Sequence, residues 1–290
     1  MILRKKRKGT IFLILLLIIT LIVFISTITK SKPAQKDSEA VSEASQPNNT
    51  ETIEVKTSVT KNLSEEEIEK SQKRGLPVLM YHFFYDAQAG ETAPDNNYME
   101  IHDFEEQIKY LSENNYYVPT WNEVLGYINK ENGLPEKSVI ITVDDGAESF
   151  FRLAVPILNK YNFKATSFAI TSWYTIPMDM DLHNIDLQSH SHDMHKPGKD
   201  GKGAFLTMSY EDACNDLNLS RSILGDSCIV FCYPFGHFNN TCKQILKDCN
   251  YSLAFTTACG RVFPGSDAYE LPRVRISKGI SLNSFISKVK

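Results

Sequence analysis

Short β-prone segments alternate with helical patterns from residue 76 onward, and this alternation limits the fold more than any other feature. The β-prone runs are residues 76–81, 138–143, 164–170, 185–188, 228–232 and 251–256. Apolar residues recur with helical spacing in the intervals, at residues 103–114, 121–128, 148–161, 210–224 and 239–249. Strands that alternate with helices are typical of parallel βαβ units. The pattern therefore predicts an α/β fold, either an open sheet or a barrel.

Polar or turn-forming residues directly follow four of these predicted strands. In chain order they are His82, Asp144-Asp145-Gly146, Ser189-His190-Ser191-His192 and Tyr233-Pro234-Phe235-Gly236. Active sites of parallel α/β proteins are built at the carboxyl edge of the strands. The four endings therefore predict one shared site at that edge.

The Asp144-Asp145 pair follows a buried strand and precedes a glycine. Adjacent carboxylates repel each other unless a cation or a proton lies between them. One interpretation is a metal ligand beside a general base, with Gly146 allowing a tight turn. The other is a helix N-cap, because aspartate is favoured there and a helix is predicted next.

Three of the seven histidines lie within residues 190–195. Neutral imidazole is a common ligand of zinc-like metals, and two histidines with one carboxylate leave positions open for water. His190 and His195 are five residues apart, so they do not share a helix face and need a loop that curls back. A solvated polar loop is the alternative interpretation.

Taken together, these motifs resemble the polysaccharide deacetylases of the NodB-homology type, carbohydrate esterase family four. The family motif T-F-D-D-G is matched by Thr142-Val143-Asp144-Asp145-Gly146, the histidine motif by His190-Ser191 with His195, and a later strand motif by Tyr233-Pro234-Phe235-Gly236. The start PVLMYH and the loop SHSHDMH are most similar to the poly-N-acetylglucosamine deacetylase-like branch. The resemblance covers about residues 76–290 and implies a distorted (β/α) barrel with fewer than eight strands.

The resemblance also implies a role for each matching residue. Asp144 is the expected general base, and the expected metal ligands are Asp145, His190 and His195. The backbone N–H of Tyr233 is the expected oxyanion donor. His82 is the expected catalytic acid, because most of the family places this acid near the C-terminus, where the sequence has no histidine. The implied cofactor is a divalent metal, with zinc expected first and cobalt, nickel or manganese as alternatives.

Three features depart from the family pattern. The usual arginine before the Tyr-Pro motif is missing, since residues 229–232 are apolar. Arg273 is the candidate to orient Asp144 instead. The helix expected between residues 170 and 185 is short, and His192 is a rival to His195 as a ligand.

The N-terminal part differs from the rest of the chain. Residues 1–9 are basic, and residues 10–29 form an apolar run long enough to cross a membrane. A basic segment before an anchor stays in the cytoplasm, which predicts an extracytoplasmic domain on a single-pass membrane anchor. A cleaved signal peptide is the alternative. Residues 30–75 are expected to form a flexible stalk, with a short helix signalled by Ser64 and Glu67, and residues 76–290 the deacetylase domain.

All six cysteines lie in the last third of the chain, at positions 214, 228, 232, 242, 249 and 259. An even number in an exported domain suggests disulfides, and small buried apolar residues are the alternative. Cys228 and Cys232 are too far apart on one predicted strand to pair. Cys242 and Cys249 are too far apart on one predicted helix.

These observations predict a hydrolase that acts on carbon–nitrogen bonds other than peptide bonds. Its expected substrate is the N-acetyl group of an N-acetylglucosamine-containing polymer of the cell envelope, either peptidoglycan or poly-N-acetylglucosamine. An O-acetyl polysaccharide esterase, a catalytically inactive sugar-binding wall protein and a membrane-tethered interaction domain are the alternatives. The formal net charge of -4 gives no reason to expect a nucleic-acid partner, and a monomer is expected.

Overall fold

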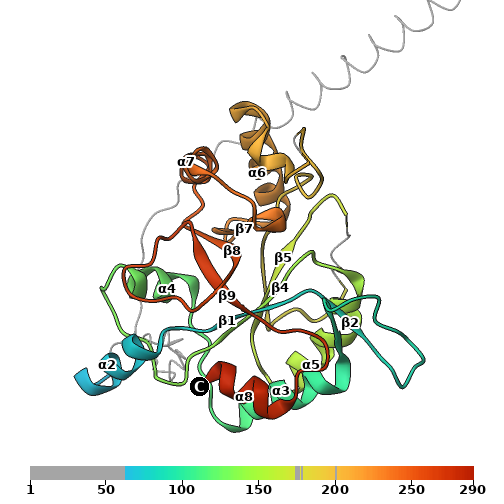
Figure 1. The fold of residues 1–290 in the computed structure, drawn as a ribbon, viewed down its shortest axis with the longest axis vertical. Helices are drawn as coiled ribbons and strands as arrows, with labels where there is room; N and C mark the ends of the chain where they lie inside the picture. The colour runs from blue at the N-terminus through green and yellow to red at the C-terminus, as the bar shows by residue number, and fades with distance from the viewer. Residues whose placement is uncertain (1–62, 174–176, 178, 200) are drawn as a thin grey trace, which may run out of the picture. The chain divides into compact units, whose positions relative to one another are not determined.

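The computed structural model describes residues 63–173, 177, 179–199 and 201–290 (Figure 1). Seven parallel strands close into a barrel in the order β1-β4-β5-β6-β7-β8-β9. Their bounds are β1 Val78–Tyr81, β4 Ile140–Val143, β5 Ala165–Ala169, β6 Ile185–Ser189, β7 Val230–Cys232, β8 Leu253–Cys259 and β9 Leu271–Arg275. The predicted α/β barrel with fewer than eight strands is confirmed.

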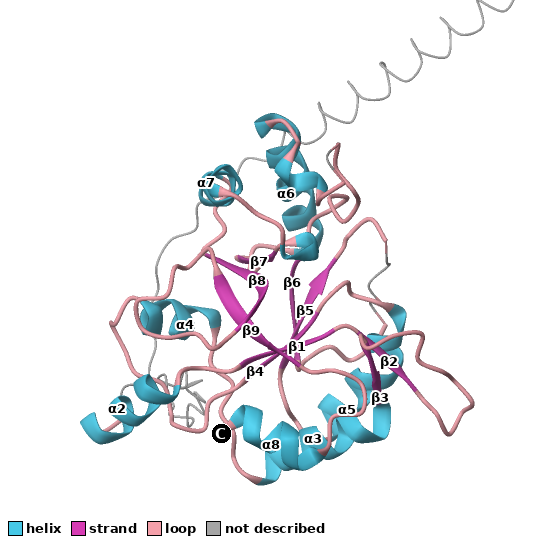
Figure 2. Ribbon diagram, in the orientation of Figure 1, coloured by secondary structure: helices cyan, strands magenta, loops and turns pink. Residues whose placement is uncertain are grey.

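Helices surround this barrel (Figure 2). Their bounds are α2 Glu65–Arg74, α3 Ile101–Glu113, α4 Trp121–Ile128, α5 Val155–Lys160, α6 Tyr210–Leu224, α7 Asn240–Asp248 and α8 Leu282–Val289. A π-helical turn, η2 (Phe150–Ala154), precedes α5 and occupies the first part of the helix predicted over residues 148–161. Side chains cap most helix starts, as in the box formed by Thr120 and Glu123 at α4.

The strands bury both faces, as expected for parallel strands covered by helices. One apolar cluster collects alternate residues from most of the barrel strands, including Val78, Ile140 and Phe168, and it forms the interior together with α4. A second cluster packs the outer faces of β1 and β4 against α3, α5 and α8. A third packs β7 and β8 against α6 and α7.

Several elements are not predicted by the sequence pattern. A separate two-stranded parallel sheet joins β2 (Phe83–Tyr85) and β3 (Tyr98–Glu100). Strand β9 pairs with β8 and β1 and so closes the barrel. The sequence pattern does not predict this strand, because it contains Pro272 and Arg273, and neither residue type is typical of a barrel strand. Helix α8 was also not predicted.

The start of the folded domain differs from the prediction. Helix α2 begins at the capping box of Ser64 and Glu67, as the sequence indicates. Arg74 at its end donates to the carbonyls of Ser138 (3.0 Å) and Val289 (2.6 Å), so this helix is part of the folded domain and not of a flexible stalk. The predicted anchor at residues 10–29 and the stalk up to residue 62 lie outside the described residues. No helix within the described residues is long and apolar enough to span a membrane.

Candidate functional site

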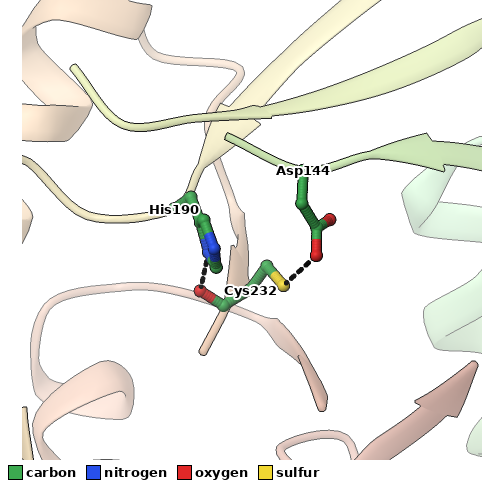
Figure 3. Close-up of side chains that lie close together, drawn as sticks. All are labelled: Asp144, His190 and Cys232. Atoms are coloured by element: carbon green, nitrogen blue, oxygen red, sulfur yellow. Dashed lines mark hydrogen bonds between the residues drawn. The ribbon is translucent and has the colours of Figure 1, made fainter. Parts of the chain in front are cut away.

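The predicted site residues lie at the carboxyl ends of the barrel strands, where parallel strands bring them to one edge. Figure 3 shows that the side chains of Asp144, His190 and Cys232 lie close together although they follow or end three different strands. The remaining members of the edge are His82 after β1, Asp145 after β4, His195 in the loop after β6 and Arg273 within β9. The predicted convergence of the four polar strand endings is therefore present.

Asp145, His190 and His195 form a compact group of potential metal ligands. Oδ1 of Asp145 lies 3.6 Å from Nε2 of His190 and 3.7 Å from Nε2 of His195. The three donor atoms all lie within 4.8 Å of one another. Oδ1 of Asp145 is buried and has no hydrogen-bond partner among the described residues. A buried carboxylate oxygen without a donor is costly unless a cation or proton meets it, so this group fits a divalent metal.

The ring of His190 is oriented for metal binding. Its Nδ1 lies 2.7 Å from the carbonyl oxygen of Cys232, which fixes Nδ1 as the donor and leaves Nε2 as the free acceptor. Burial lowers the pKa of His190 to about 3 and also lowers the pKa of His195. Both rings are therefore neutral at physiological pH, which is the form that binds a metal.

The loop that carries the two histidines is held by helix α6. Oδ1 and Oδ2 of Asp216 accept the backbone N–H groups of His192 and Asp193, each at 2.7 Å. Ser191, at a φ of 80°, accepts the N–H of Met194 through its hydroxyl. The loop therefore curls back, as the five-residue spacing of His190 and His195 requires.

His192 points elsewhere than the two other histidines of the loop. Its Nδ1 lies 2.9 Å from the hydroxyl of Thr171. It is not a member of any group of potential ligands among the described residues. The geometry thus groups His195, and not its rival His192, with Asp145 and His190.

Asp144 is paired with Arg273 and not with the histidines. Nη1 of Arg273 donates to Oδ1 at 2.6 Å, and Nη2 donates to Oδ2 at 2.7 Å. Nη1 also reaches the hydroxyl of Thr142, and Nη2 reaches the sulfur of Cys232 at 3.1 Å. Arg273 is 1% exposed. The family pattern has an arginine before the Tyr-Pro motif that this chain lacks, and Arg273 on β9 holds Asp144 instead, as predicted.

The two adjacent carboxylates have opposite pKa shifts. Burial alone would raise the pKa of Asp144, but the charge and hydrogen bonds of Arg273 outweigh it and hold the pKa well below its usual range. Burial, together with the negative charge of Asp144, raises the pKa of Asp145 to about 7. Asp144 is thus a carboxylate at neutral pH. At Asp145, a nearby cation would stabilise the ionised form, which burial and Asp144 disfavour.

The backbone turn after β4 separates these two side chains. Asp145 has a φ of 73° and Gly146 a φ of 69°, both in the left-handed region. A Cβ at position 146 would lie 3.0 Å from the Cβ of Ala169 and 3.1 Å from its Cα. Glycine is therefore required there by both conformation and space. A helix N-cap, the alternative interpretation of the pair, does not describe this turn, because no side-chain cap is present at the helix that follows.

His82 lies next to the paired carboxylate. Its Nε2 is 3.7 Å from Oδ2 of Asp144, and its side chain is 19% exposed. Burial lowers the pKa of His82, and the negative charge of Asp144 partly offsets that shift. The ring is thus within reach of both Asp144 and solvent-borne molecules.

The structure does not fit the prediction that the backbone of Tyr233 binds an oxyanion. The N–H of Tyr233 donates to the carbonyl of Phe255 at 3.0 Å, next to the β7–β8 ladder. The Tyr233 side chain is buried, and its hydroxyl donates to the carbonyl of Tyr269 at 3.1 Å. This N–H is therefore already used by the fold.

Sequence reasoning missed two contributors to the site, Cys232 and Asp216. Cys232 accepts from Arg273 and lies 3.6 Å from Oδ2 of Asp144, but a cysteine inside an apolar strand gives no signal of such a contact. Asp216 lies within a helix that the sequence pattern predicts, but the pattern does not indicate that this side chain faces the histidine loop. The rings of Trp173 and Phe235 flank His195, with centroid distances of 5.1 and 4.2 Å, and both are partly exposed.

A second group of potential ligands overlaps the first. It consists of Asp144, His190 and Cys232, whose donor atoms also lie within 4.8 Å of one another. Both oxygens of Asp144 already accept from Arg273, and the sulfur of Cys232 lies within hydrogen-bond distance of the same guanidinium. A cation there would face the positive charge of Arg273. The group around Asp145 therefore fits a metal better.

The structure is a parallel seven-stranded barrel with a carboxylate–histidine group at its carboxyl edge, which is the usual place of the active site in α/β-barrel enzymes. The family model described as polysaccharide deacetylase matches residues 131–254. This segment therefore carries a polysaccharide deacetylase domain, in agreement with the motifs that resemble the NodB-homology type.

Individual relatives and structures agree with this assignment. Poly-beta-1,6-N-acetyl-D-glucosamine N-deacetylase from Staphylococcus aureus (strain MRSA252) is 31% identical over 195 residues, which are 60% of this chain and 66% of that protein. Deacetylase PplD from Streptococcus pyogenes, solved in complex with acetate, has a TM-score of 0.64 at 24% identity and covers 74% of this chain and 98% of its own. IcaB from Ammonifex degensii has a TM-score of 0.61 at 24% identity, covering 74% and 95%. The last two matches show the fold.

Proposed function

We propose that the protein is a metal-dependent hydrolase that removes N-acetyl groups from an N-acetylglucosamine-containing polysaccharide. The observation that carries this proposal is the pairing of two unlike carboxylates. Oδ1 of Asp145 lies unpartnered between two neutral histidines, while Asp144 next to it is ionised and held by Arg273. Metal-assisted amide hydrolysis uses a cation site and a general base beside it, and this pair of carboxylates provides both. The name of the staphylococcal relative supports an amino-sugar polymer as substrate.

The metal ligands in this proposal are Asp145, His190 and His195. When bound there, a divalent cation such as zinc supplies Lewis-acid polarisation of the acyl oxygen and lowers the pKa of nearby water. The rings of Trp173 and Phe235 lie beside His195, and because they are exposed they are suited to pack against sugars.

The remaining steps are assigned to side chains that the fold already orients. Asp144 takes a proton from the attacking water, and Arg273 keeps it ionised and fixed in position. His82, on the other side of Asp144, gives a proton to the leaving sugar nitrogen. Pro234 has no N–H, so the next backbone donor after Tyr233 is Phe235, and we assign the oxyanion contact to it.

We further propose that this domain works outside the cytoplasm on the cell's own envelope. The support is the sequence of residues 1–29, where a basic segment precedes an apolar run. A tethered domain is suited to polymer near the membrane. Protease accessibility of the domain on intact cells tests this part, because a cytoplasmic domain would be protected.

Acetate release by the full-length chain tests the activity. The substrates are β-1,6- and β-1,4-linked N-acetylglucosamine oligomers, peptidoglycan fragments and O-acetylated xylan, each with and without added zinc or cobalt. Metal-dependent release from an amide substrate, lost in Asp144→Asn and Asp145→Ala, supports the proposal. Release from the ester substrate alone would indicate an O-acetyl esterase. Metal and sugar binding without acetate release would indicate an inactive sugar-binding protein.

A matched pair of histidine variants tests the ligand set. His195→Ala should lose metal binding and activity, because it removes one of the three potential ligands, Asp145, His190 and His195. His192→Ala should keep both, because this ring contacts Thr171 instead. The reverse result would overturn the assignment of His195.

A further inference from the structure

Helix α6 and the end of helix α7 lie alongside each other, at the top of the view in Figure 1. At one end of α6, the hydroxyl of Tyr210 donates to Oδ2 of Asp248 at 2.7 Å. At the other end, Nη1 of Arg221 donates to the carbonyl of Cys249 at 3.4 Å. These contacts fix the stretch just after α7 along one face of α6.

Cys214 lies on that same face of α6. Residues 210, 214, 217 and 221 are separated by three or four positions, so they line one side of the helix. Both ends of this row, Tyr210 and Arg221, contact residues 248–250. In the middle of the row, the hydroxyl of Tyr251 donates to the carbonyl of Leu217. Cys214 therefore faces Cys249 across the helix contact.

The immediate surroundings of the two thiols agree with this placement. Cys249 is 4% exposed and belongs to the apolar cluster between α6, α7 and the barrel, and half-buried Cys214 packs against that cluster. Burial raises the pKa of Cys249 to about 12, and a hydrogen bond with the Cys214 thiol adds to the rise. Both thiols thus lie at the same helix contact, and Cys214 is the one that solvent reaches.

We propose that Cys214 and Cys249 form a disulfide when the protein meets an oxidised thiol compound. The inference does not depend on the deacetylase activity. In the reaction, the Cys214 thiolate attacks a small-molecule disulfide, and Cys249 then displaces the second thiol. One sulfur–sulfur bond forms, another breaks, and the two protons and two electrons from the protein leave as two small-molecule thiols.

The other cysteines do not offer such a pair. Cys232 contacts Arg273 and Asp144, and the sulfur of Cys242 lies 3.8 Å from the carbonyl of Phe205. Cys228 is fully buried, and Cys259 is exposed at the end of β8. Intramolecular disulfide formation is therefore expected only between Cys214 and Cys249 among these cysteines. Cys259 remains as an accessible single thiol.

The cross-link would act on the helix that holds the histidine loop. Asp216, which accepts the N–H groups of His192 and Asp193, lies half a turn from Cys214 on α6. Ser220 on the same helix contacts the hydroxyl of Ser189 at 2.8 Å. A bond between α6 and the end of α7 therefore limits local opening of the segment that carries His190 and His195.

Thiol counting on the full-length chain tests the proposal. The protein is equilibrated with either reduced or oxidised glutathione, denatured, alkylated and digested, and the peptides are identified by mass. Oxidation should remove two alkylation sites and produce one peptide pair that joins Cys214 to Cys249. It should also raise the melting temperature by roughly 5–10 °C, as expected for a disulfide that closes a loop of this length.

Two variants serve as controls. Cys214→Ser replaces a half-buried thiol at low structural cost and should abolish both the linked peptide and the rise in melting temperature. Cys259→Ser removes the exposed thiol and should leave both results unchanged. The proposal is overturned if Cys249 stays open to alkylation after oxidation, or if Cys214 is recovered joined to glutathione or to another cysteine.

Discussion

The two sides of the site differ although they begin at adjacent residues. On the β9 side, each carboxylate oxygen of Asp144 accepts a hydrogen bond from Arg273, and the pair is buried. On the α6 side, Oδ1 of Asp145 has no donor and faces two neutral imidazoles. The charge of Asp144 is therefore balanced within the protein, whereas Oδ1 of Asp145 still requires a cation or a proton. Two identical residue types thus obtain opposite electrostatic environments from a single turn of backbone.

The largest expected effect comes from removing the guanidinium that pairs with Asp144. Arg273→Leu leaves the Asp144 carboxylate buried without its counter-charge, which should destabilise the protein by about 3–5 kcal/mol in urea unfolding. Without Arg273, burial is the dominant influence and raises the pKa of Asp144. A carboxylate base works only above its pKa, so the acid limb of the rate profile should move to higher pH.

Arg275 provides the matched control for this prediction. It lies two residues further along β9, is exposed, and contacts Asn97 instead of the site. Arg275→Leu should leave the free energy of unfolding and the acid limb nearly unchanged. Equal effects of the two variants would mean that the Asp144–Arg273 pair contributes no more to stability or to the acid limb than an exposed arginine does.

The next effect concerns the support of the α6 side. Asp216→Asn keeps the size of the side chain but provides one carbonyl acceptor where two carboxylate oxygens now hold the loop. We expect metal affinity to fall by about 10–100-fold, as is typical when a partner that orients ligands is lost. Titration with cobalt, followed by its absorption spectrum, measures this without relying on activity.

Asp212→Asn is the control for that titration. Asp212 lies one turn earlier on α6 and bonds with Ser209 at the helix start. Its replacement should change metal affinity little. If Asp212→Asn and Asp216→Asn weaken metal binding equally, α6 affects the loop only through general stability.

Much of this comparison was predictable from sequence, but its two sides were not equally so. Parallel strands bring their ends together, so the convergence of Asp145, His190 and His195 follows from the polar endings of two apolar runs. Arg273 was proposed only because the chain lacks the arginine that the family usually has. The strand that carries it, β9, was not predicted, because it contains Pro272 and Arg273. A buried arginine is stable only beside its carboxylate, and that contact spans 129 residues of sequence.

Contacts set by backbone register could not be predicted at all. Tyr233 was expected to offer its N–H to substrate, but whether an N–H is free depends on which strand lies beside it. Here β8 places the carbonyl of Phe255 against it. The choice between His192 and His195 likewise depends on Thr171 and Asp216, which no local motif connects to the histidines.

The pH dependence of metal binding gives a smaller, graded effect. In the metal-free protein the raised pKa of Asp145 is about 7, so its carboxyl is largely protonated below that pH. Metal must displace this proton, and affinity should fall by up to about tenfold for each pH unit below 7. The histidines do not add to this slope, because burial lowers their pKa values. Constant affinity between pH 5.5 and 8 would contradict the assignment of Asp145 as a ligand.

The smallest effect sharpens the comparison most directly, because it asks whether an unpartnered polar atom implies a ligand. Two buried side-chain atoms among the described residues lack a hydrogen-bond partner, Oδ1 of Asp145 and Oγ of Ser167. Ser167 lies on β5, and a neutral serine hydroxyl is a much weaker cation ligand than a carboxylate. Ser167→Ala removes a hydroxyl that is buried without a bond, so it should stabilise the protein by up to about 1 kcal/mol and leave metal affinity unchanged. Asp145→Ala also removes an unpartnered atom, yet it should abolish metal binding. A Ser167→Ala variant that loses stability would show that its hydroxyl has a partner, and an unpartnered oxygen at Asp145 would then be weaker evidence for a cation.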